Sequence, residues 1–255
     1  MDDNPLATAR LALACLDLTS LNDNDDAAAI DALCQRAVSP YGSVAAVCVW
    51  PRFVAQARAA LPAAVRVAAV ANFPQGALDR DAALADAALV AEAGGNEIDL
   101  VLPWRAWAAG ERPACTALVA AVRRAHPGLT LKLILESGEL NDEALIASAS
   151  QMALDEGVDF LKTSTGKMPT SATPGAAGTM LAAIAMHPRR GQAGFKASGG
   201  IRTVADARLY IDLTRAALGS VTPQNFRLGA SGLMTDILAL LSGAASSGAT
   251  PSTSY

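Results

Sequence analysis

The seven residues Thr-Leu-Lys-Leu-Ile-Leu-Glu at positions 130–136 decide the fold. Leucines alternate with Lys132, Ile134 and Glu136, which is the two-residue period of a β-strand. One face of this strand is all leucine, whereas the other face carries a lysine and a glutamate. Such a strand fits a closed sheet, whose outer face packs against helices and whose charged positions point inward. The stretch therefore predicts a barrel with a polar interior.

Seven further strand-like runs share the chain with it, and Ala-rich segments of helical period separate them. They span residues 12–19, 44–50, 66–73, 97–103, 159–163, 194–198 and 226–230. Eight such units predict an α/β fold, a single (β/α)8 TIM barrel over residues 1–255. The first ten residues are expected to form a short extra helix, and residues 242–255 a flexible tail. A doubly wound sheet is the alternative, although it more often carries a G-x-G-x-x-G motif, which is lacking here.

Composition excludes several classes of protein. The chain has 255 residues, 52% of them hydrophobic and 17% charged, which rules out disorder, collagen and small disulfide scaffolds. Its apolar runs are too short for a membrane span, and its start does not resemble a secretory signal, so a cytoplasmic location is expected. The net charge of -4 argues against a nucleic-acid partner. The cysteines at 15, 34, 48 and 115 are widely spaced, which favours reduced thiols over disulfides or structural zinc.

Histidine is scarce, and this narrows the chemistry. The chain has only His126 and His187, each directly before a proline at the expected end of a helix, where exposure is expected. A histidine-based metal centre and a Ser-His-Asp or Cys-His apparatus are therefore not expected, and no metal site is predicted.

Lysine is equally scarce, but its placement is informative. The chain has only four lysines, and Lys132, Lys162 and Lys196 lie within or at the ends of apolar, strand-like runs. Snorkelling or an ion pair would explain any one of them. Three together favour a task that arginine cannot perform, such as nucleophilic attack of an amine on a carbonyl group.

Alternation along the strands predicts which side chains point into the barrel. It places Asp17 and Thr19 inside on the first strand, and Cys48 and Asn72 inside on the second and third. At the mouth formed by the strands' carboxyl ends, where such barrels carry out chemistry, it collects a set of acidic and basic side chains. This set is Asp17, Asp99, Glu136, Lys162 and Lys196.

This cluster suits an aldolase. Two ammonium groups on neighbouring strands repel each other, and burial disfavours both charges, so one amine can be neutral near physiological pH. A neutral amine forms an imine with a substrate carbonyl, and the protonated imine withdraws electrons from the adjacent carbon–carbon bond. Asp99 is the best-placed group for proton transfer, although a plain salt bridge to a lysine is an equal alternative. Alternation does not decide between Lys162 and Lys196 as the nucleophile.

Loops rich in small residues suggest a phosphate site. Gly199 and Gly200 follow the seventh strand, and residues 229–232, Gly-Ala-Ser-Gly, follow the eighth. The loops at these places in TIM barrels often bind phosphate through backbone N–H groups, although glycine pairs also form plain turns. Lys167, in the loop after the sixth strand, could contribute a positive charge or lie free in solvent.

Several motifs resemble those of the 2-deoxyribose-5-phosphate aldolase family. The strongest are F-L-K-T-S-T-G-K at residues 160–167 and G-F-K-A-S-G-G-I-R at residues 194–202. L-D-L-T-S-L-N-D at 16–23, V-C-V-W-P-R-F at 47–53, N-F-P-Q-G at 72–76, E-I-D-L-V at 97–101, L-E-S-G-E-L at 135–140 and F-R-L-G-A-S-G at 226–232 match in the same order. The resemblance covers almost the whole chain.

The resemblance implies a class I, Schiff-base aldolase without metal or organic cofactor. Such an enzyme reversibly splits 2-deoxy-D-ribose 5-phosphate into acetaldehyde and D-glyceraldehyde 3-phosphate, with phosphosugar and aldehydes as its partners and a homodimer as a frequent assembly. It further implies that Lys162 is the imine-forming nucleophile, that Lys196 lowers the pKa of Lys162, and that Asp99 transfers protons.

Other positions match the family's substrate contacts. The resemblance places Asp17, Thr19 and Cys48 around the substrate, and it assigns phosphate contacts to Gly166, Lys167, Gly199, Gly200, Gly229 and Ser231. Tyr255 matches a terminal tyrosine that assists proton exchange, although its position alone predicts only part of a flexible tail.

Three positions depart from the family pattern. Ser198 stands where proline is more usual, Gly232 where a second serine is expected, and Ser137 where threonine is more familiar. The glycine is expected to remove one hydrogen bond to phosphate, worth about 1.5 to 3 kcal/mol for a bond to a charged group. These departures are therefore expected to change the affinity for phosphate and not the reaction that is catalysed.

Two rival functions share the barrel. A phosphosugar isomerase would need a carboxylate base and a neutral electrophile such as histidine, yet no predicted strand carries a histidine. A sugar-phosphate binding protein would keep the glycine loops but has no need of paired lysines. Trapping of a covalent imine separates the aldolase from the binder.

Overall fold

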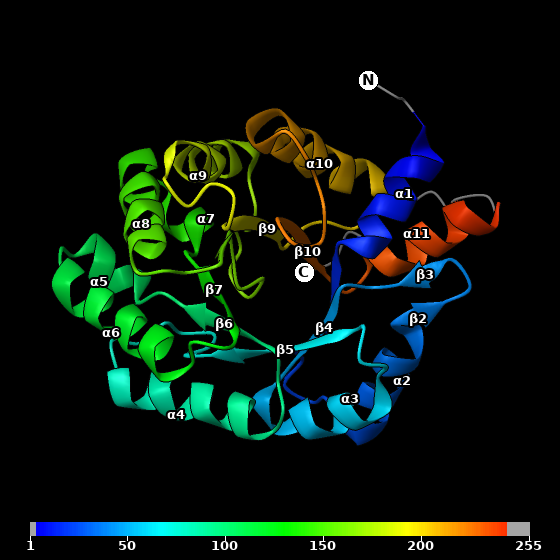
Figure 1. Ribbon diagram of the computed structural model, residues 1–255, viewed down its shortest axis with the longest axis horizontal. Coiled ribbons are helices and arrows are strands. Elements are labelled where there is room, and N and C mark those ends of the chain that lie inside the picture. Colours follow the sequence, from blue (N-terminus) through cyan, green and yellow to red (C-terminus); the bar gives the residue numbers. More distant parts are fainter. Residues whose placement is uncertain (1–3, 244–255) are drawn as a thin grey trace.

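The computed structural model describes residues 4–243 and shows a closed barrel of parallel strands surrounded by helices (Figure 1). β1 pairs with β10 on one side and with β4 on the other, so the sheet has no free edge. The barrel strands are β1 (Leu16–Thr19), β4 (Ala46–Val49), β5 (Arg66–Ala71), β6 (Glu97–Val101), β7 (Thr130–Ile134), β8 (Phe160–Lys162), β9 (Gly194–Ser198) and β10 (Phe226–Ala230). The predicted (β/α)8 barrel is confirmed, and the doubly wound alternative is excluded.

The helices form the outer ring of the molecule (Figure 1). They are α1 (Pro5–Ala14), α2 (Ala27–Arg36), α3 (Val54–Ala60), α4 (Arg80–Glu92), α5 (Trp104–Ala108), α6 (Arg112–Ala125), α7 (Ser137–Leu140), α8 (Glu143–Asp155), α9 (Pro174–Met186), α10 (Val204–Leu218) and α11 (Leu233–Ser242). A short 3-10 helix, η1 (Pro51–Phe53), precedes α3, and β2 (Val38–Ser39) and β3 (Gly42–Ser43) form a small hairpin. Polar caps such as Asp26, Asp142 and Thr203 bind backbone N–H groups in the first turns of α2, α8 and α10.

The strands have two faces of different chemistry, as the alternation predicts. Leu131, Leu133 and Leu135 belong to the large apolar core that also contains the buried residues of the helices. Cys48, on the other face of its strand, belongs to a small separate cluster with Ala68 and Val70. The apolar layer between barrel and helices therefore holds the fold together, and the barrel interior is left for polar groups.

The first strand begins later than the sequence suggests. Residues from Ala12 were expected in it, but α1 continues to Ala14 and β1 starts at Leu16. Asn4 caps α1, Pro5 occupies its first turn, and Ala and Leu continue it, so helix-forming residues extend the element.

The third strand also ends sooner than expected. It stops at Ala71, and Asn72 adopts a φ of 55°. The Asn72 side-chain amide donates hydrogen bonds to the carbonyl oxygens of Ala77 and Val101 and accepts one from the N–H of Ala77. Asn72 therefore lies beyond the end of the strand, where its amide orders the loop after β5, and alternation along β5 does not fix the direction of its side chain.

Predictions for the ends of the chain and for the scarce residues have mixed outcomes. α11 includes Ser242, and the remainder of the predicted tail lies outside the described residues. His187 is not exposed as expected, because only 8% of it is accessible and its Nε2 lies 3.1 Å from Oδ1 of Asp155. All four cysteines are buried and unpaired, which confirms the expected thiols.

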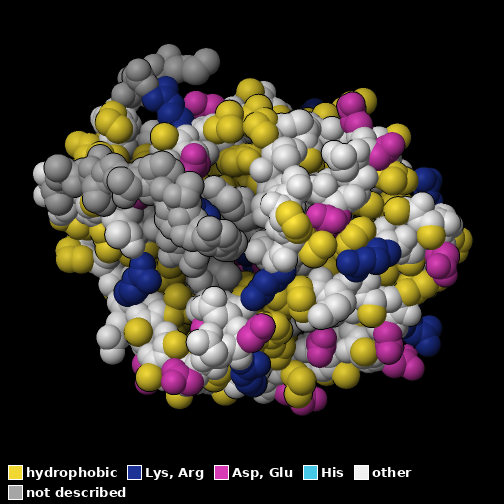
Figure 2. Space-filling model, turned by 180° about the vertical axis from the view of Figure 1, so that it is seen from behind, with side chains coloured by type: hydrophobic (Ala, Val, Ile, Leu, Met, Phe, Trp, Pro, Cys, Tyr) yellow, Lys and Arg dark blue, Asp and Glu magenta, His cyan; other side chains and the backbone are white. Residues whose placement is uncertain are grey.

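The surface shows mixed charge. On the face in Figure 2, Lys and Arg side chains lie singly among acidic and apolar ones. Among residues 4–243, none of the helices combines the length and the apolar character needed to cross a lipid bilayer.

Close packing inside the barrel at its amino-terminal end generates a first prediction. Gly194 pairs with Phe160, and a Cβ atom at Gly194 would lie 2.7 Å from Cδ1 of Phe160 and 2.8 Å from the carbonyl oxygen of Asn225. Gly194→Ala should therefore lower the free energy of unfolding by about 1 to 3 kcal/mol, measured by chemical denaturation. Gly191→Ala is the matched control, because an added Cβ meets nothing within 4 Å there. Equal stability of both variants would contradict this packing argument.

Candidate active site

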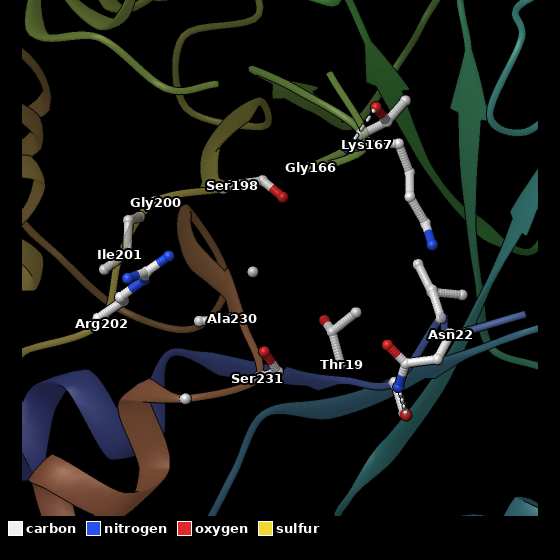
Figure 3. A pocket seen from close by; sticks show the side chains of 16 residues that line it. Thr19, Asn22, Gly166, Lys167, Ser198, Gly200, Ile201, Arg202, Ala230 and Ser231 are labelled. Atoms are coloured by element: carbon white, nitrogen blue, oxygen red, sulfur yellow. Dashed lines mark hydrogen bonds between the residues drawn. The ribbon is translucent and has the colours of Figure 1, made fainter. Parts of the chain in front are cut away.

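A pocket of about 450 Å³ opens where β1, β8, β9 and β10 end (Figure 3). It is lined by residues 19–22, 165–167, 198–202 and 229–232. Its size suits a small ligand, and its place at the carboxyl ends of the strands is that of the active site in TIM barrels.

The pocket brings together the residues expected to contact phosphate. Its lining includes Gly166, Lys167, Gly199, Gly200, Gly229 and Ser231, together with Thr19, which was expected near the substrate. Arg202 and Asn22 also line it, although neither was singled out from the sequence. Figure 3 shows Lys167 and Arg202 on opposite sides of the pocket. The pocket wall thus carries two cations and several N–H and hydroxyl groups that can bind an anion.

A layer of charged side chains lies directly beneath this pocket. Thr19 and Ser198 line the pocket, and the residues two positions earlier on the same strand faces are Asp17 and Lys196. Two residues along a strand correspond to about 6.6 Å, so the charged groups occupy the next layer of the barrel interior. Asp17 and Lys196 are both fully buried.

Asp99 is the centre of the charged layer. Its Oδ2 lies 2.8 Å from Nζ of Lys162 and 2.8 Å from Nζ of Lys196, and its Oδ1 lies 2.6 Å from Nζ of Lys132. Sγ of Cys48 is 3.9 Å from the same Oδ2. Since one oxygen contacts two ammonium groups, the nitrogens of Lys162 and Lys196 lie on the same side of the strand wall.

Asp17 and Gly229 position Lys196. Nζ of Lys196 lies 2.5 Å from Oδ2 of Asp17, in addition to its contact with Asp99. A Cβ atom at Gly229 would lie only 2.9 Å from Cε of Lys196. A side chain at Gly229 would therefore displace the lysine, so this glycine has a packing role besides its place in the pocket wall.

The electrostatics distinguish Lys162 from the other buried lysines. Burial lowers the pKa of Lys162, and the Lys196 ammonium adds to this effect, so that together they outweigh the attraction of Asp99. Burial alone would also lower the pKa of Lys196 and of Lys132, but the neighbouring carboxylates reverse the direction and raise both. Lys162 is thus the amine most easily freed of its proton.

For Asp99, the neighbouring charges outweigh the effect of burial on the pKa. Burial alone would raise its pKa, but the positive charges of Lys132, Lys162 and Lys196 hold it well below its usual value. The carboxylate is therefore ionised, and it is in direct contact with the amine of Lys162.

Three members of the charged cluster were not identified as site residues from the sequence. Lys132 contacts Glu97 at 2.7 Å as well as Asp99, and Arg227 contacts Glu97 at 2.9 Å and Asp17 at 2.7 Å. Alternation had placed Lys132 inside the barrel but not within the cluster, and applied to β6 it places Glu97 inside as well, two residues before Asp99. Applied to β10, it would also have placed Arg227 inside, because Arg227 lies two residues before Gly229.

Glu136 has a different place from the one expected. It follows β7 with a φ of 51°, and its carboxylate accepts hydrogen bonds from the backbone N–H and the hydroxyl of Thr165. Burial raises the pKa of Glu136. Its carboxylate joins the loop after β7 to the loop after β8, instead of entering the cluster around Asp99.

The structure shows the surroundings of the three residues that depart from the family pattern. The N–H of Ser198 donates to Oγ1 of Thr163 at 3.0 Å, a bond that proline could not make. Gly232 lies in the pocket wall and starts α11 without a side-chain cap. Ser137 is buried, and its hydroxyl has no hydrogen-bond partner among the described residues.

Two further expectations concern a metal and the end of the chain. Within residues 4–243, no group of three or more His, Cys, Asp or Glu side chains is arranged to hold a metal ion. Tyr255, expected to assist proton exchange, lies outside the described residues.

Comparison with known proteins agrees with these features. The DeoC/LacD family aldolase model matches residues 11–235. A deoxyribose-phosphate aldolase from Agrobacterium fabrum is 46% identical over 244 residues, which cover 94% of this chain and 93% of that protein. A candidate deoxyribose-phosphate aldolase from Toxoplasma gondii superposes with a TM-score of 0.86 at 25% identity, covering 96% of this chain and 97% of that one. One from Coccidioides immitis gives 0.79 at 28% identity, covering 89% and 85%.

The match to the family model and the match to the Agrobacterium protein both extend over most of the chain and include the strands that carry Asp99, Lys162 and Lys196. The resemblance found in the sequence motifs is therefore confirmed. The chain belongs to the DeoC/LacD family of aldolases.

Proposed function

We propose that this aldolase reversibly cleaves 2-deoxy-D-ribose 5-phosphate to acetaldehyde and D-glyceraldehyde 3-phosphate through a Schiff base on Lys162, without a metal or organic cofactor. The observation that carries the proposal is the contact of Lys162 and Lys196 with one oxygen of Asp99 beneath the pocket. The name of the Agrobacterium relative supports the choice of substrate.

The reaction begins with the neutral amine of Lys162. It attacks the aldehyde carbon of the open-chain sugar and forms a carbinolamine, which loses water to give a protonated imine. Asp99 lies 2.8 Å from Nζ of Lys162, so it can receive a proton from the amine and return one to the departing hydroxyl.

Carbon–carbon cleavage follows from the positive charge of the imine. As the substrate's C3 hydroxyl loses its proton, the bond between C2 and C3 breaks, and its electron pair moves through C2 and C1 to the imine nitrogen. D-Glyceraldehyde 3-phosphate leaves, and an enamine remains on Lys162. Protonation of C2 and addition of water then release acetaldehyde and restore the amine. Asp99 is the assigned group for these proton transfers.

The pocket wall supplies the phosphate site. Backbone N–H groups of the glycine-containing loops after β8, β9 and β10, the hydroxyl of Ser231 and the Lys167 ammonium are the expected partners of the phosphate. Because Lys167 is exposed and lines the pocket, it can add a positive charge there without joining the buried cluster.

Two wider expectations accompany this function. Four buried, unpaired thiols support an enzyme that works in a reducing compartment, the cytoplasm. A homodimer stays a prediction, to be checked by light scattering coupled to size-exclusion chromatography.

Lys162→Arg should fold and lose activity by about 10⁴-fold or more, because a guanidinium group cannot be deprotonated to act as a nucleophile. Treatment of the wild-type protein with acetaldehyde and borohydride should leave a stable adduct, which peptide mass mapping will locate at Lys162. Absence of an adduct in folded protein that binds the sugar phosphate would favour the binding-protein alternative. Substantial turnover by Lys162→Arg would contradict the nucleophile assignment.

Lys196→Leu should shift the rising limb of the pH–activity profile to higher pH by about one unit or more. Without the Lys196 cation, repulsion no longer disfavours the Lys162 ammonium, so the pKa of Lys162 rises and the neutral amine forms only in more alkaline solution. Lys167→Ala is a matched control, because that lysine lies outside the buried cluster. A rising limb that stays in place in Lys196→Leu would remove the proposed role of Lys196.

Lys167→Ala should also raise KM for 2-deoxy-D-ribose 5-phosphate by roughly ten- to a hundredfold, the value of one interaction with a charged group. Cleavage of unphosphorylated 2-deoxy-D-ribose should change little, since that substrate has no group for Lys167 to bind. Steady-state kinetics with both substrates provide the test. An equal loss for both sugars would show that Lys167 does not act on the phosphate.

A further inference from the structure

The charged cluster extends from the pocket to the opposite end of the barrel. There Glu97 and Arg227 line a second hollow together with Arg66, and only 6% of Arg227 is accessible. The guanidinium of Arg227 binds both oxygens of Glu97 and Oδ1 of Asp17. Arg227 therefore reaches the same aspartate that holds Lys196, but from the side away from the pocket.

The buried cluster contains more basic groups than carboxylates. It contains three buried carboxylates, on Asp17, Glu97 and Asp99, and four buried basic groups, on Lys132, Lys162, Lys196 and Arg227. Arg66 also contacts Glu97, at 3.5 Å, but 45% of its side chain is exposed, so water compensates its charge. If all four basic groups were protonated, the buried cluster would carry one excess positive charge, which is costly to bury. Loss of one proton balances the cluster at three positive and three negative charges.

The contacts identify the group that gives up the proton. Lys132 contacts all three carboxylates, and Arg227 and Lys196 contact two each. Among the described residues, Lys162 forms an ion pair only with Asp99, on the oxygen it shares with Lys196. Lys162 is thus the basic group with the least compensation.

We propose that Arg227 and Glu97, at the end of the barrel away from the pocket, are positioning residues that set the charge balance of the cluster and thereby leave Lys162 as the uncompensated amine. This inference rests on the proposed role of Lys162 as the nucleophile. Arg227 and Lys132 together occupy the oxygens of Glu97, and Arg227 also binds one oxygen of Asp17, so these oxygens are already shared between cations and do not reach Lys162.

Other titratable groups also face Lys162, and the variants proposed in the next paragraph leave all of them unsubstituted. They are Asp99 on β6, Lys132 on β7, Lys196 on β9, Cys48 on β4, and Glu136 after β7. Burial raises the pKa of Cys48, which keeps it a neutral thiol, and the carboxylate of Glu136 is bonded to Thr165. The variants change only Arg227 and Glu97, neither of which contacts Lys162.

The test compares R227Q, E97Q and the double variant R227Q/E97Q with the wild-type protein. Each protein is incubated with acetaldehyde and cyanoborohydride over a range of pH, and mass mapping gives the rate of adduct formation at Lys162. The midpoint of the rising limb reports the deprotonation of the Lys162 amine and does not depend on turnover of the sugar phosphate.

The two single variants should move this midpoint in opposite directions, each by about one pH unit. Removal of the Arg227 charge leaves a surplus carboxylate, which stabilises the Lys162 ammonium, so the midpoint should rise. Removal of the Glu97 charge leaves a further surplus cation, so the midpoint should fall. In the double variant the balance is restored, and the midpoint should return to within a few tenths of a unit of the wild-type value.

A purely structural role predicts a different pattern. Such a role would lower the stability of both single variants and leave the midpoint of adduct formation unchanged. The control variant Arg123→Gln is expected to show this pattern. Arg123 forms a half-buried ion pair with Asp159 at 2.9 Å, outside the cluster. Midpoints that stay in place, or that move in the same direction in R227Q and E97Q, would overturn the proposal.

Two further comparisons keep the test decisive. If R227Q does not fold, the other two variants still separate the alternatives. The midpoint should fall in E97Q and stay near the wild-type value in R227Q/E97Q. R227K retains the charge and should keep the midpoint of the wild type. Failure of the proposed function would look different, because the wild-type protein would then form no adduct at Lys162 at any pH.

Discussion

The sharing of one oxygen of Asp99 by two ammonium groups is the interaction on which the site depends. Lys162 and Lys196 both lie 2.8 Å from Oδ2 of Asp99, in a part of the barrel with almost no access to water. A single carboxylate oxygen cannot compensate two buried cations, and Lys196 has Asp17 as a second partner. The shortage of negative charge therefore falls on Lys162, whose pKa is lowered as the proposed role of nucleophile requires.

Closure of the barrel is what makes this arrangement possible. Asp17 and Lys196 are 179 positions apart, and Asp17 and Arg227 are 210 positions apart, yet β1 pairs directly with β10, and β10 with β9. In an open sheet, β1 would not pair with β10, and the two ends of the cluster would be exposed to solvent. Burial of the ion pairs, and with it the low pKa of Lys162, depends on that closure.

The sequence predicts which face of a strand a residue occupies better than it predicts the height of that residue in the barrel. Alternating leucines placed Lys132 inside, and the last two strands, residues 194–198 and 226–230, have the predicted bounds. Contact between layers depends on the stagger of neighbouring strands, which a single sequence does not reveal. For this reason the cluster was predicted without Lys132, Glu97 and Arg227, and the choice of Lys162 came from the family resemblance.

The pocket wall and the charged cluster beneath it are separate layers of the barrel, so substitutions in them have different effects. An added Cβ at Gly232, where serine is expected, would meet nothing within 4 Å, whereas one at Gly229 would lie 2.9 Å from Cε of Lys196. Ser198 belongs to both layers, because it lines the pocket and its N–H binds Thr163, the residue next to Lys162. A change at position 198 or 229 can therefore reach both the pocket wall and the ion pairs beneath it, whereas a change at position 232 is expected to alter only the pocket wall and, with it, the proposed phosphate site.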